Sequence, residues 1–144
     1  VQLALLRAGT VQLQPDTVPA GWLEDFRAAQ LTAQVTRRGL WAREETRVLY
    51  TGEAGNALGE ARFIRGRILY TGESKGRVWL NFGPDYRTDF TVFLAPAVAA
   101  ALAEEELTPA ALTGRRVEIY GLIRNENGPA VELTSGAAIR VIPD

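Results

Sequence analysis

The sequence predicts an α+β protein with a helical N-terminal segment and a five-stranded β-barrel in the rest of the chain. Apolar residues recur at helical spacing up to about residue 41, whereas from residue 61 they alternate with polar residues as in strands. An alanine-rich stretch that begins at Pro96 separates the third and fourth of these strands. With 144 residues, 47% of them hydrophobic, the chain is long enough to bury one ordinary core.

The first 41 residues are expected to form a helix, a short strand and a second helix. Gly9 follows an apolar run and is expected to end the first helix in a left-handed conformation. Alternation over 11–13 predicts a short strand, and a second helix is expected from about Pro19. One apolar stripe of this helix comprises Trp22, Phe26, Ala29 and Ala33. We expect Trp22, Phe26 and Trp41 to be core residues of this segment.

Residues 43–57 have the composition of a charged, glycine-bearing connector, with one strand expected around 48–50. Three barrel strands are then expected over 61–69, 77–82 and 88–94. In the second strand the residues expected to face inward are Val78, Leu80 and Phe82. Those expected to face outward are Arg77, Trp79 and Asn81.

The last part of the chain is expected to contain one helix and two further strands. The helix begins at Pro96 and ends near Glu105, and a break follows at Thr108–Pro109. The fourth strand covers 117–123, and a hairpin turn at 125–128 leads to the fifth strand. Three strands, a helix and two strands is the order of an OB-fold barrel. The predicted division of the chain is 1–42, a connector at 43–57, and a barrel domain at 58–144.

Residues 1–9, Phe26–Ala29 and Arg38–Ala42 together resemble the C-terminal end of a staphylococcal-nuclease-like (thermonuclease) domain. Gln30 departs from that pattern, because the family usually carries glutamate there. The stretches 78–83, 89–92, 114–117 and 128–134 resemble the small OB-fold domain that often follows such nuclease domains. The resemblance implies a nucleic-acid-binding module and, because many thermonucleases are exported, a periplasmic or secreted protein. The residues themselves leave the compartment unknown.

The chain as given is predicted to be non-catalytic and to need no cofactor. It has no cysteine or histidine, which excludes disulfides, thiol nucleophiles, imidazole bases and zinc sites of the usual N/S type. The thermonuclease resemblance places the calcium-binding aspartates, the general-base glutamate and the two phosphate-binding arginines upstream of Val1. No metal site is expected at Glu104–Glu106, because consecutive carboxylates on a helix point in different directions. No apolar run reaches the roughly 18 to 20 residues that span a bilayer, so no membrane partner is expected.

The candidate site is a basic and aromatic face of the predicted barrel. Across residues 61–87 there are six cations and two carboxylates, so the local charge is 6 − 2 = +4. The cations are Arg62, Arg65, Arg67, Lys75, Arg77 and Arg87. A second group includes Arg116, Tyr120 and Arg124, of which the last two are expected to share an outward face. The predicted nucleic-acid-binding residues are Arg65, Arg67, Lys75, Arg77, Trp79, Asn81, Arg87, Arg116, Tyr120 and Arg124.

OB-folds bind single strands through aromatic stacking and cationic contacts, so weak, sequence-tolerant binding of single-stranded nucleic acid is the favoured function. In one alternative, Trp79 packs against the 22–38 helix or the connector while the arginines pair with Glu44, Glu45 and Glu53. The barrel would then be a protein-interaction or structural module without a nucleic-acid ligand. In another, the chain is the C-terminal fragment of an active, metal-dependent phosphodiesterase. An apolar N-terminal surface would favour an upstream nuclease barrel or a second copy of the chain as partner.

Overall fold

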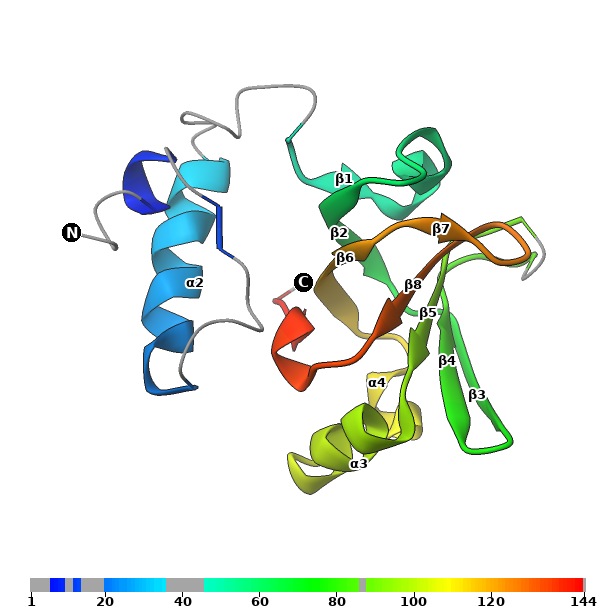
Figure 1. Ribbon diagram of the computed structural model, residues 1–144. Helices are drawn as coiled ribbons and strands as arrows, with labels where there is room; N and C mark the ends of the chain where they lie inside the picture. Colours follow the sequence, from blue (N-terminus) through cyan, green and yellow to red (C-terminus); the bar gives the residue numbers. More distant parts are fainter. Residues whose placement is uncertain (1–5, 10–11, 14–19, 36–45, 86–87, 144) are drawn as a thin grey trace. The chain divides into compact units, whose positions relative to one another are not determined.

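The computed structural model describes residues 6–9, 12–13, 20–35, 46–85 and 88–143 (Figure 1). The chain divides into two compact units, Val1–Val48 and Leu49–Asp144. Residues 49–57, which the sequence placed in the connector, thus belong with the second unit by their contacts. The interpretation of the N-terminal segment as part of a nuclease-like domain stays a prediction.

In the first unit the helical expectations are confirmed. Gly9 has a φ of 76°, and its N–H donates to the Leu6 carbonyl at 3.1 Å, so it ends the first helical turn as expected. The second helix is α2, Ala20–Val35. Its buried residues include Ala29 at the centre of a small cluster with Leu6 and Leu13.

The expectation that Trp22 is a core residue is wrong, because 56% of its surface is exposed. Trp22 lies on the same stripe as Ala29 but two helical turns before it, beyond the buried cluster. Phe26, one turn closer, is half-buried and packs against the cluster. Gln12 and Leu13 are not part of a strand, whereas Val11 and Trp41 lie outside the described residues.

The first half of the second unit contains five strands. They are β1 (Leu49–Tyr50), β2 (Ala61–Arg67), β3 (Tyr70–Ser74), β4 (Arg77–Asn81) and β5 (Thr91–Leu94). A 3-10 helix, η3 (Thr51–Asn56), follows β1. The strand expected over 61–69 ends at Arg67, and the chain continues through Ile68 and Leu69 into β3, which joins the other sheet.

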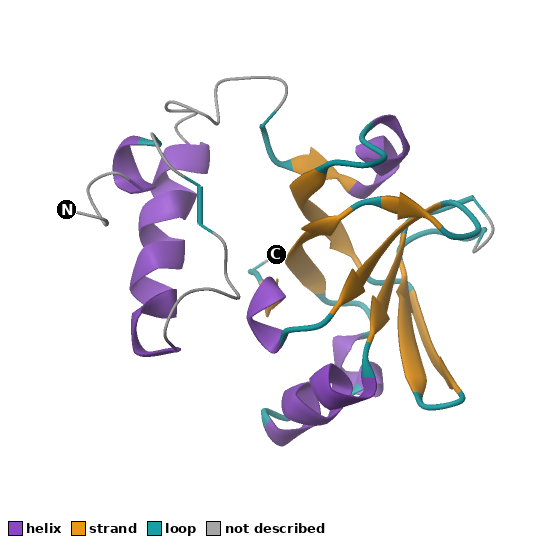
Figure 2. Ribbon diagram, viewed as in Figure 1, coloured by secondary structure: helices purple, strands orange, loops and turns teal. Residues whose placement is uncertain are grey.

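The second half has the expected helix, strand and hairpin order. Its elements are α3 (Pro96–Glu104), α4 (Pro109–Leu112), β6 (Arg116–Leu122), β7 (Arg124–Asn125), β8 (Pro129–Leu133), η4 (Gly136–Ala138) and β9 (Ile139–Val141). Pro96 occupies the first turn of α3, as predicted. Thr108 caps α4, since its hydroxyl oxygen accepts from the Ala111 N–H at 3.2 Å. The helices α3 and α4 gather at one end of the barrel (Figure 2).

The strand order is that of an OB-like barrel. One sheet has the order β1-β2-β6-β9 and the other β3-β4-β5-β8-β7. The chain passes between the sheets four times, from β2 to β3, from β5 to β6, from β6 to β7 and from β8 to β9. Within the first sheet β2 pairs antiparallel with β6, and within the second sheet β5 pairs in parallel with β8. The predicted α+β OB-fold class is therefore confirmed.

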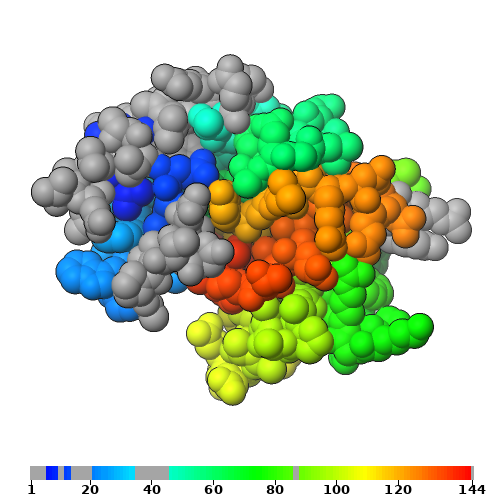
Figure 3. Space-filling view, viewed as in Figure 1, coloured from blue at the N-terminus to red at the C-terminus, as the bar shows by residue number. Residues whose placement is uncertain are grey.

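The barrel interior contains the residues that the alternation assigned to it. In β4, Val78 and Leu80 are 3% and 0% exposed, and Phe82 just after the strand is 9% exposed. Ile119 of β6 and Val131 of β8 complete the same core. Each such side chain contributes roughly 1.5–3 kcal/mol to folding when it is fully buried. Helix α3 covers one end of this core and lies next to η4 (Figure 3).

Candidate nucleic-acid interface

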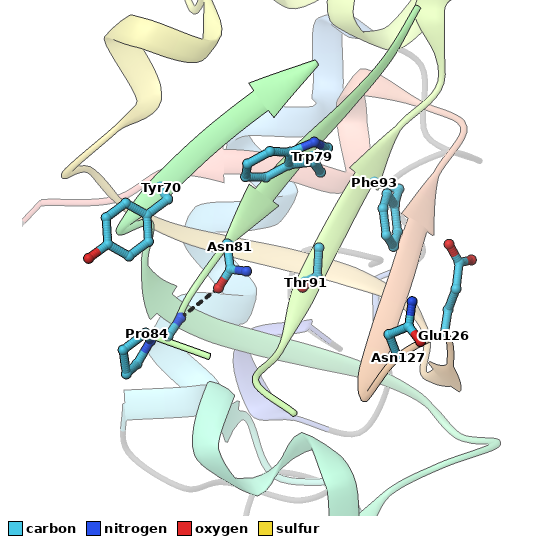
Figure 4. Close-up of a pocket in the computed structure, with 9 residues that line it drawn as sticks. Tyr70, Trp79, Asn81, Pro84, Thr91, Phe93, Glu126 and Asn127 are labelled. Carbon is cyan, nitrogen blue, oxygen red and sulfur yellow. Dashed lines mark hydrogen bonds between the residues drawn. The ribbon is translucent and has the colours of Figure 1, made fainter. Parts of the chain in front are cut away.

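The outward face of the five-stranded sheet carries two parallel rows of side chains. In the first row, Asn81 of β4 is directly opposite Tyr70 of β3 and Thr91 of β5. In the second row, Trp79 of β4 is opposite Gly72 of β3 and Phe93 of β5. Residues directly opposite each other share a face of the sheet, so a polar row lies beside an aromatic one. Figure 4 shows the side chains of both rows on neighbouring strands.

These rows line a hollow of about 620 Å³ on the barrel surface. The residues that line it are Tyr70, Trp79, Asn81, Gly83, Pro84, Thr91, Phe93, Glu126 and Asn127. Three aromatic side chains from three adjacent strands therefore border one cavity (Figure 4). Tyr70 is the most accessible of them, with 57% of its surface exposed, while Trp79 and Phe93 are half-buried.

The position of Trp79 depends on the glycine opposite it. A Cβ atom at Gly72 would lie only 2.0 Å from Cζ2 of the indole ring, so the ring lies directly on the backbone of β3. A glycine in the middle of a strand often marks such a close approach. The prediction that Trp79 faces outward is confirmed, and its side chain borders the hollow.

Asn81 is 3% exposed, although it lies on the outward face. Its Oδ1 accepts a hydrogen bond of 3.0 Å from the N–H of Gly83, which begins the loop after β4. This bond fixes the orientation of the side-chain amide, with its oxygen toward the loop after β4 and its nitrogen on the opposite side. Asn81 therefore links the end of β4 to the floor of the hollow.

Arg77 belongs to a network of alternating charges. Its guanidinium donates to Glu126 at 2.8 and 3.2 Å and to Glu132 at 3.2 Å. Arg124 contacts the same two carboxylates at 3.1 and 3.4 Å. The hydrogen bond between Arg77 and Glu126 raises the pKa of Arg77 and lowers the pKa of Glu126. The Arg77 guanidinium also lies 3.7 Å above the ring centroid of Phe93, so one face of that ring is covered.

Four of the predicted site residues lie on the other sheet and do not join this hollow. Arg65 of β2 pairs with Glu118 of β6 at 2.7 Å, and Arg67 donates to the Gly114 carbonyl at 2.7 Å. Arg116 is opposite Arg67 on β6, and Tyr120 packs on Phe63 with ring centroids 4.7 Å apart.

The expectation that Tyr120 and Arg124 share a face is wrong, because they belong to different sheets. The chain leaves β6 after Leu122 and enters β7 through Ile123. Because the strand is interrupted there, the alternation of side chains in β6 does not continue to Arg124. The bend at 68–69 similarly separates Arg65 and Arg67 from Trp79. The sequence missed these changes of sheet because alternation over neighbouring residues does not report them.

The expectation of one basic face is also wrong for the described residues. Arg62 is buried and pairs with Glu60 at 3.0 Å, while Arg65 and Arg77 pair with glutamates of later segments. Of the glutamates expected to neutralise these arginines, Glu44 and Glu45 lie outside the described residues, and Glu53 accepts from the Tyr50 N–H. Lys75 is exposed in the β3–β4 turn, and Arg87 lies outside the described residues.

Sequence reasoning missed Tyr70, Phe93, Glu126 and Asn127 as lining residues. The signal for Phe93 was present, because alternation along the strand expected over 88–94 places Phe93 on the face opposite to Phe90 and Val92. Tyr70 was missed because the first barrel strand was expected to end at Leu69, which left Tyr70 outside the predicted strands. Glu126 and Asn127 reach the hollow from the hairpin turn, whose position over β5 depends on the sheet closure.

Within the described ranges, no cluster of three or more acidic, cysteine or histidine side chains is arranged to hold a metal ion. In the same part of the chain, no helix has both the length and the apolar character to cross a bilayer.

No protein-family model and no curated protein matches the chain. Solved structures are similar in chain path. A putative aspartyl-tRNA synthetase from Leishmania major Friedlin matches 69% of this chain over 21% of its own, with a TM-score of 0.49 and 9% identity. Asparaginyl-tRNA synthetase from Pyrococcus horikoshii matches 65% over 22%, with a TM-score of 0.49 and 16% identity. The S. pombe Stn1-ten1 complex matches 58% over 59%, with a TM-score of 0.44 and 14% identity. The chain thus spans about a fifth of each synthetase chain. The OB-like assignment rests on the strand order itself.

Proposed function

We propose that the β3–β4–β5 face binds single-stranded nucleic acid weakly, by stacking unpaired bases on its aromatic side chains. The observation that supports this proposal is the grouping of Tyr70, Trp79 and Phe93 around one hollow. Every base has a π-face, so such a surface tolerates sequence. Each base stacked on an aromatic residue contributes roughly 1–3 kcal/mol, which corresponds to weak binding for so small a site.

The charges around the hollow favour stacking over phosphate contacts. Arg77 and Arg124 are shared between Glu126 and Glu132, so these four charges cancel. Lys75, in the turn that joins β3 to β4, is exposed and has no carboxylate partner among the described residues. For single strands, the logarithm of the binding constant falls with the logarithm of the salt concentration, with a slope of about −0.7 for each phosphate that the protein neutralises. Because few phosphates would be neutralised here, we expect affinity to depend only weakly on salt. Of the ten predicted nucleic-acid-binding residues, Trp79 and Asn81 line the hollow, and a binding role for the ten stays a prediction.

The test is fluorescence anisotropy of a labelled single strand and of the matching duplex at low and moderate salt. Trp79→Ala should weaken single-strand binding by the contribution of one stacked base, about 1–3 kcal/mol. Trp22→Ala is the matched control, because Trp22 is an exposed tryptophan of the first unit and does not line the hollow. Absence of single-strand binding by the folded wild type, or equal binding by Trp79→Ala, would overturn the proposal.

A protein-interaction role is the second candidate, and the cancelled charges around Arg77 favour it. An aromatic hollow without net positive charge also suits an apolar side chain of a protein partner. If this role is correct, the anisotropy of the labelled single strand and of the duplex should not change as protein is added, even at high concentration. Association of two copies of the chain is part of the same candidate, and light scattering over a concentration series would detect it.

The nuclease parent is a separate proposal that rests on the resemblance of residues 1–42 to the end of a thermonuclease-like domain. In such a parent, an upstream barrel would carry the paired aspartates, the glutamate and the two arginines, and this OB-like unit would hold the substrate strand. Sequencing the gene upstream of the codon for Val1 tests this directly. A different upstream domain would overturn the proposal and leave single-strand binding by the barrel to be judged on its own.

A further inference from the structure

The amide nitrogen of Asn81 is a donor that lines the hollow and has no acceptor among the described residues. Asn81 is only 3% exposed, and its oxygen is already engaged by the Gly83 N–H at 3.0 Å. Among the described residues, no group accepts from its Nδ2. Figure 4 shows this nitrogen on the side of Thr91, away from Pro84 and within the lining of the hollow. This nitrogen is therefore available to donate a hydrogen bond to a group bound in the hollow.

Thr91 adds a second polar group beside this donor. It is directly opposite Asn81 on β5 and is 6% exposed. Within the described part of the chain, its hydroxyl has no hydrogen-bond partner. An asparagine amide carries two N–H donors, and a threonine hydroxyl donates or accepts. The floor of the hollow therefore offers a donor-rich edge next to the aromatic row of Trp79 and Phe93.

The chemistry of this edge limits which bases it recognises. An asparagine that reads adenine does so with two bonds, one from its nitrogen and one to its oxygen. In Asn81 the oxygen is held by Gly83, so only the donor half remains. Donors alone match ring carbonyls, and cytosine, thymine, uracil and guanine each have at least one. Adenine has no carbonyl and accepts only at its ring nitrogens, each of which has one lone pair, whereas a carbonyl oxygen has two and can accept from both Asn81 and Thr91.

We propose that Asn81, assisted by Thr91, donates to a carbonyl-bearing base stacked beside Trp79, so that the site prefers pyrimidines and guanine over adenine. This preference deepens the proposed single-strand binding and rests on it. It concerns a contact to the base edge, whereas the proposed function requires only the aromatic faces.

The test compares labelled oligo-dC, oligo-dT and oligo-dA of one length with the full chain. We expect oligo-dC and oligo-dT to bind up to about tenfold more tightly than oligo-dA, the difference that corresponds to one additional hydrogen bond to the base. Asn81→Asp keeps an oxygen for the Gly83 N–H and replaces the donors with an acceptor, so it should abolish the difference. Asn125→Asp is the matched control, because Asn125 also accepts from a glycine N–H, that of Gly128 at 3.1 Å, and does not line the hollow.

A second measurement does not depend on a variant that folds. In the wild-type protein, the side-chain amide resonances of Asn81 should shift on titration with cytidine 5′-monophosphate and shift less with adenosine 5′-monophosphate. Mononucleotides also remove the effect of base stacking within an adenine strand.

The outcomes separate the two proposals. Equal affinity for the three oligonucleotides, with loss of binding in Trp79→Ala, overturns the base preference and leaves the stacking function intact. A preference that persists in Asn81→Asp, or amide resonances that do not move with either nucleotide, overturns the role of Asn81. Absence of binding to every oligonucleotide overturns the proposed function and the base preference together.

Discussion

Glu118 on one sheet and Asn81 on the other are both buried polar residues on outward faces, but their surroundings are opposite. Glu118 of β6 is 5% exposed and lies between two arginines, with Arg65 at 2.7 Å and Arg140 at 3.7 Å. The pairing register places these three residues in one row across β2, β6 and β9. Asn81 of β4 is 3% exposed, and its nitrogen has no partner in the described chain.

The difference separates a structural role from a binding role. A buried charge that is paired within the protein is part of the folded structure, so removing its partner destabilises the fold. Its hydrogen-bonding groups are already occupied and are not available to a ligand. A donor that lines a hollow and is unpaired within the protein can form its hydrogen bond with a bound group. We therefore expect variants of the Glu118 row to change stability and variants of the Asn81 face to change binding.

The largest effect is expected for Glu118→Ala, which leaves Arg65 and Arg140 without their shared carboxylate. Removal of one partner from a buried ion pair costs about 3 kcal/mol in the free energy of unfolding. Urea denaturation measures this cost, and affinity for single strands should not change. Glu132→Ala is the control, because this glutamate is half-exposed and its loss should cost below about 1 kcal/mol. Equal costs for the two variants would contradict the assignment of a structural role to Glu118.

Tyr70→Ala should have the next largest effect, on binding. Tyr70 lines the hollow, so its loss should weaken single-strand affinity by roughly 1–3 kcal/mol, the contribution of one stacked base. Tyr50→Ala offers a close comparison, since Tyr50 is 60% exposed against 57% for Tyr70 and does not line the hollow. If the two tyrosine variants lose the same affinity in anisotropy titrations, binding does not depend on this face.

Gly72→Ala tests the position of the indole without removing it. The added methyl group would lie 2.0 Å from the Trp79 ring, so the ring must move. We expect single-strand affinity to fall by about 1 kcal/mol, less than for loss of a whole stacking residue. Gly52→Ala is the control, because its Cβ would meet nothing within 4 Å. A shift in the emission of Trp79, measured with Trp22 and Trp41 replaced by phenylalanine, would report the displacement, and an unchanged spectrum would contradict it.

The smallest effect is expected from the Arg77–Glu126 pair and its pH dependence. The hydrogen bond from Arg77 lowers the pKa of Glu126 in the folded state. The Glu126 carboxylate thus stabilises the fold above its unfolded pKa, and this contribution is lost as the pH falls through the folded pKa. Both side chains are 36% exposed, so the contribution should stay below about 1 kcal/mol.

Thermal unfolding of the wild type and of Glu126→Gln should therefore differ at neutral pH and converge in acid. Glu73→Gln serves as the control, since Glu73 is exposed on β3 and has no ion pair among the described residues. A difference that grows in acid would show that the pair does not stabilise the native state.

Local patterns in the sequence predicted most of the helices and strands of the second unit, although not β3, and the inward and outward faces of β4. Period-two alternation placed Val78 and Leu80 inside and Trp79 outside, because successive side chains of a strand point to opposite faces. Gly9 and Pro96 marked the end and the start of helices through their backbone conformations. These are properties of a few adjacent residues, so one sequence shows them.

Only the tertiary structure decided which residues meet across strands. Arg77 pairs with Glu126 and Glu132, which are 49 and 55 positions away, and no local pattern specifies those partners. The polar row of Tyr70, Asn81 and Thr91 depends on the register of three strands, and the bend at 68–69 determines which sheet Tyr70 joins. Register and sheet exchange follow from how the whole barrel closes around its core, so the charge balance and the unpaired donor of the site emerge only when the chain is folded.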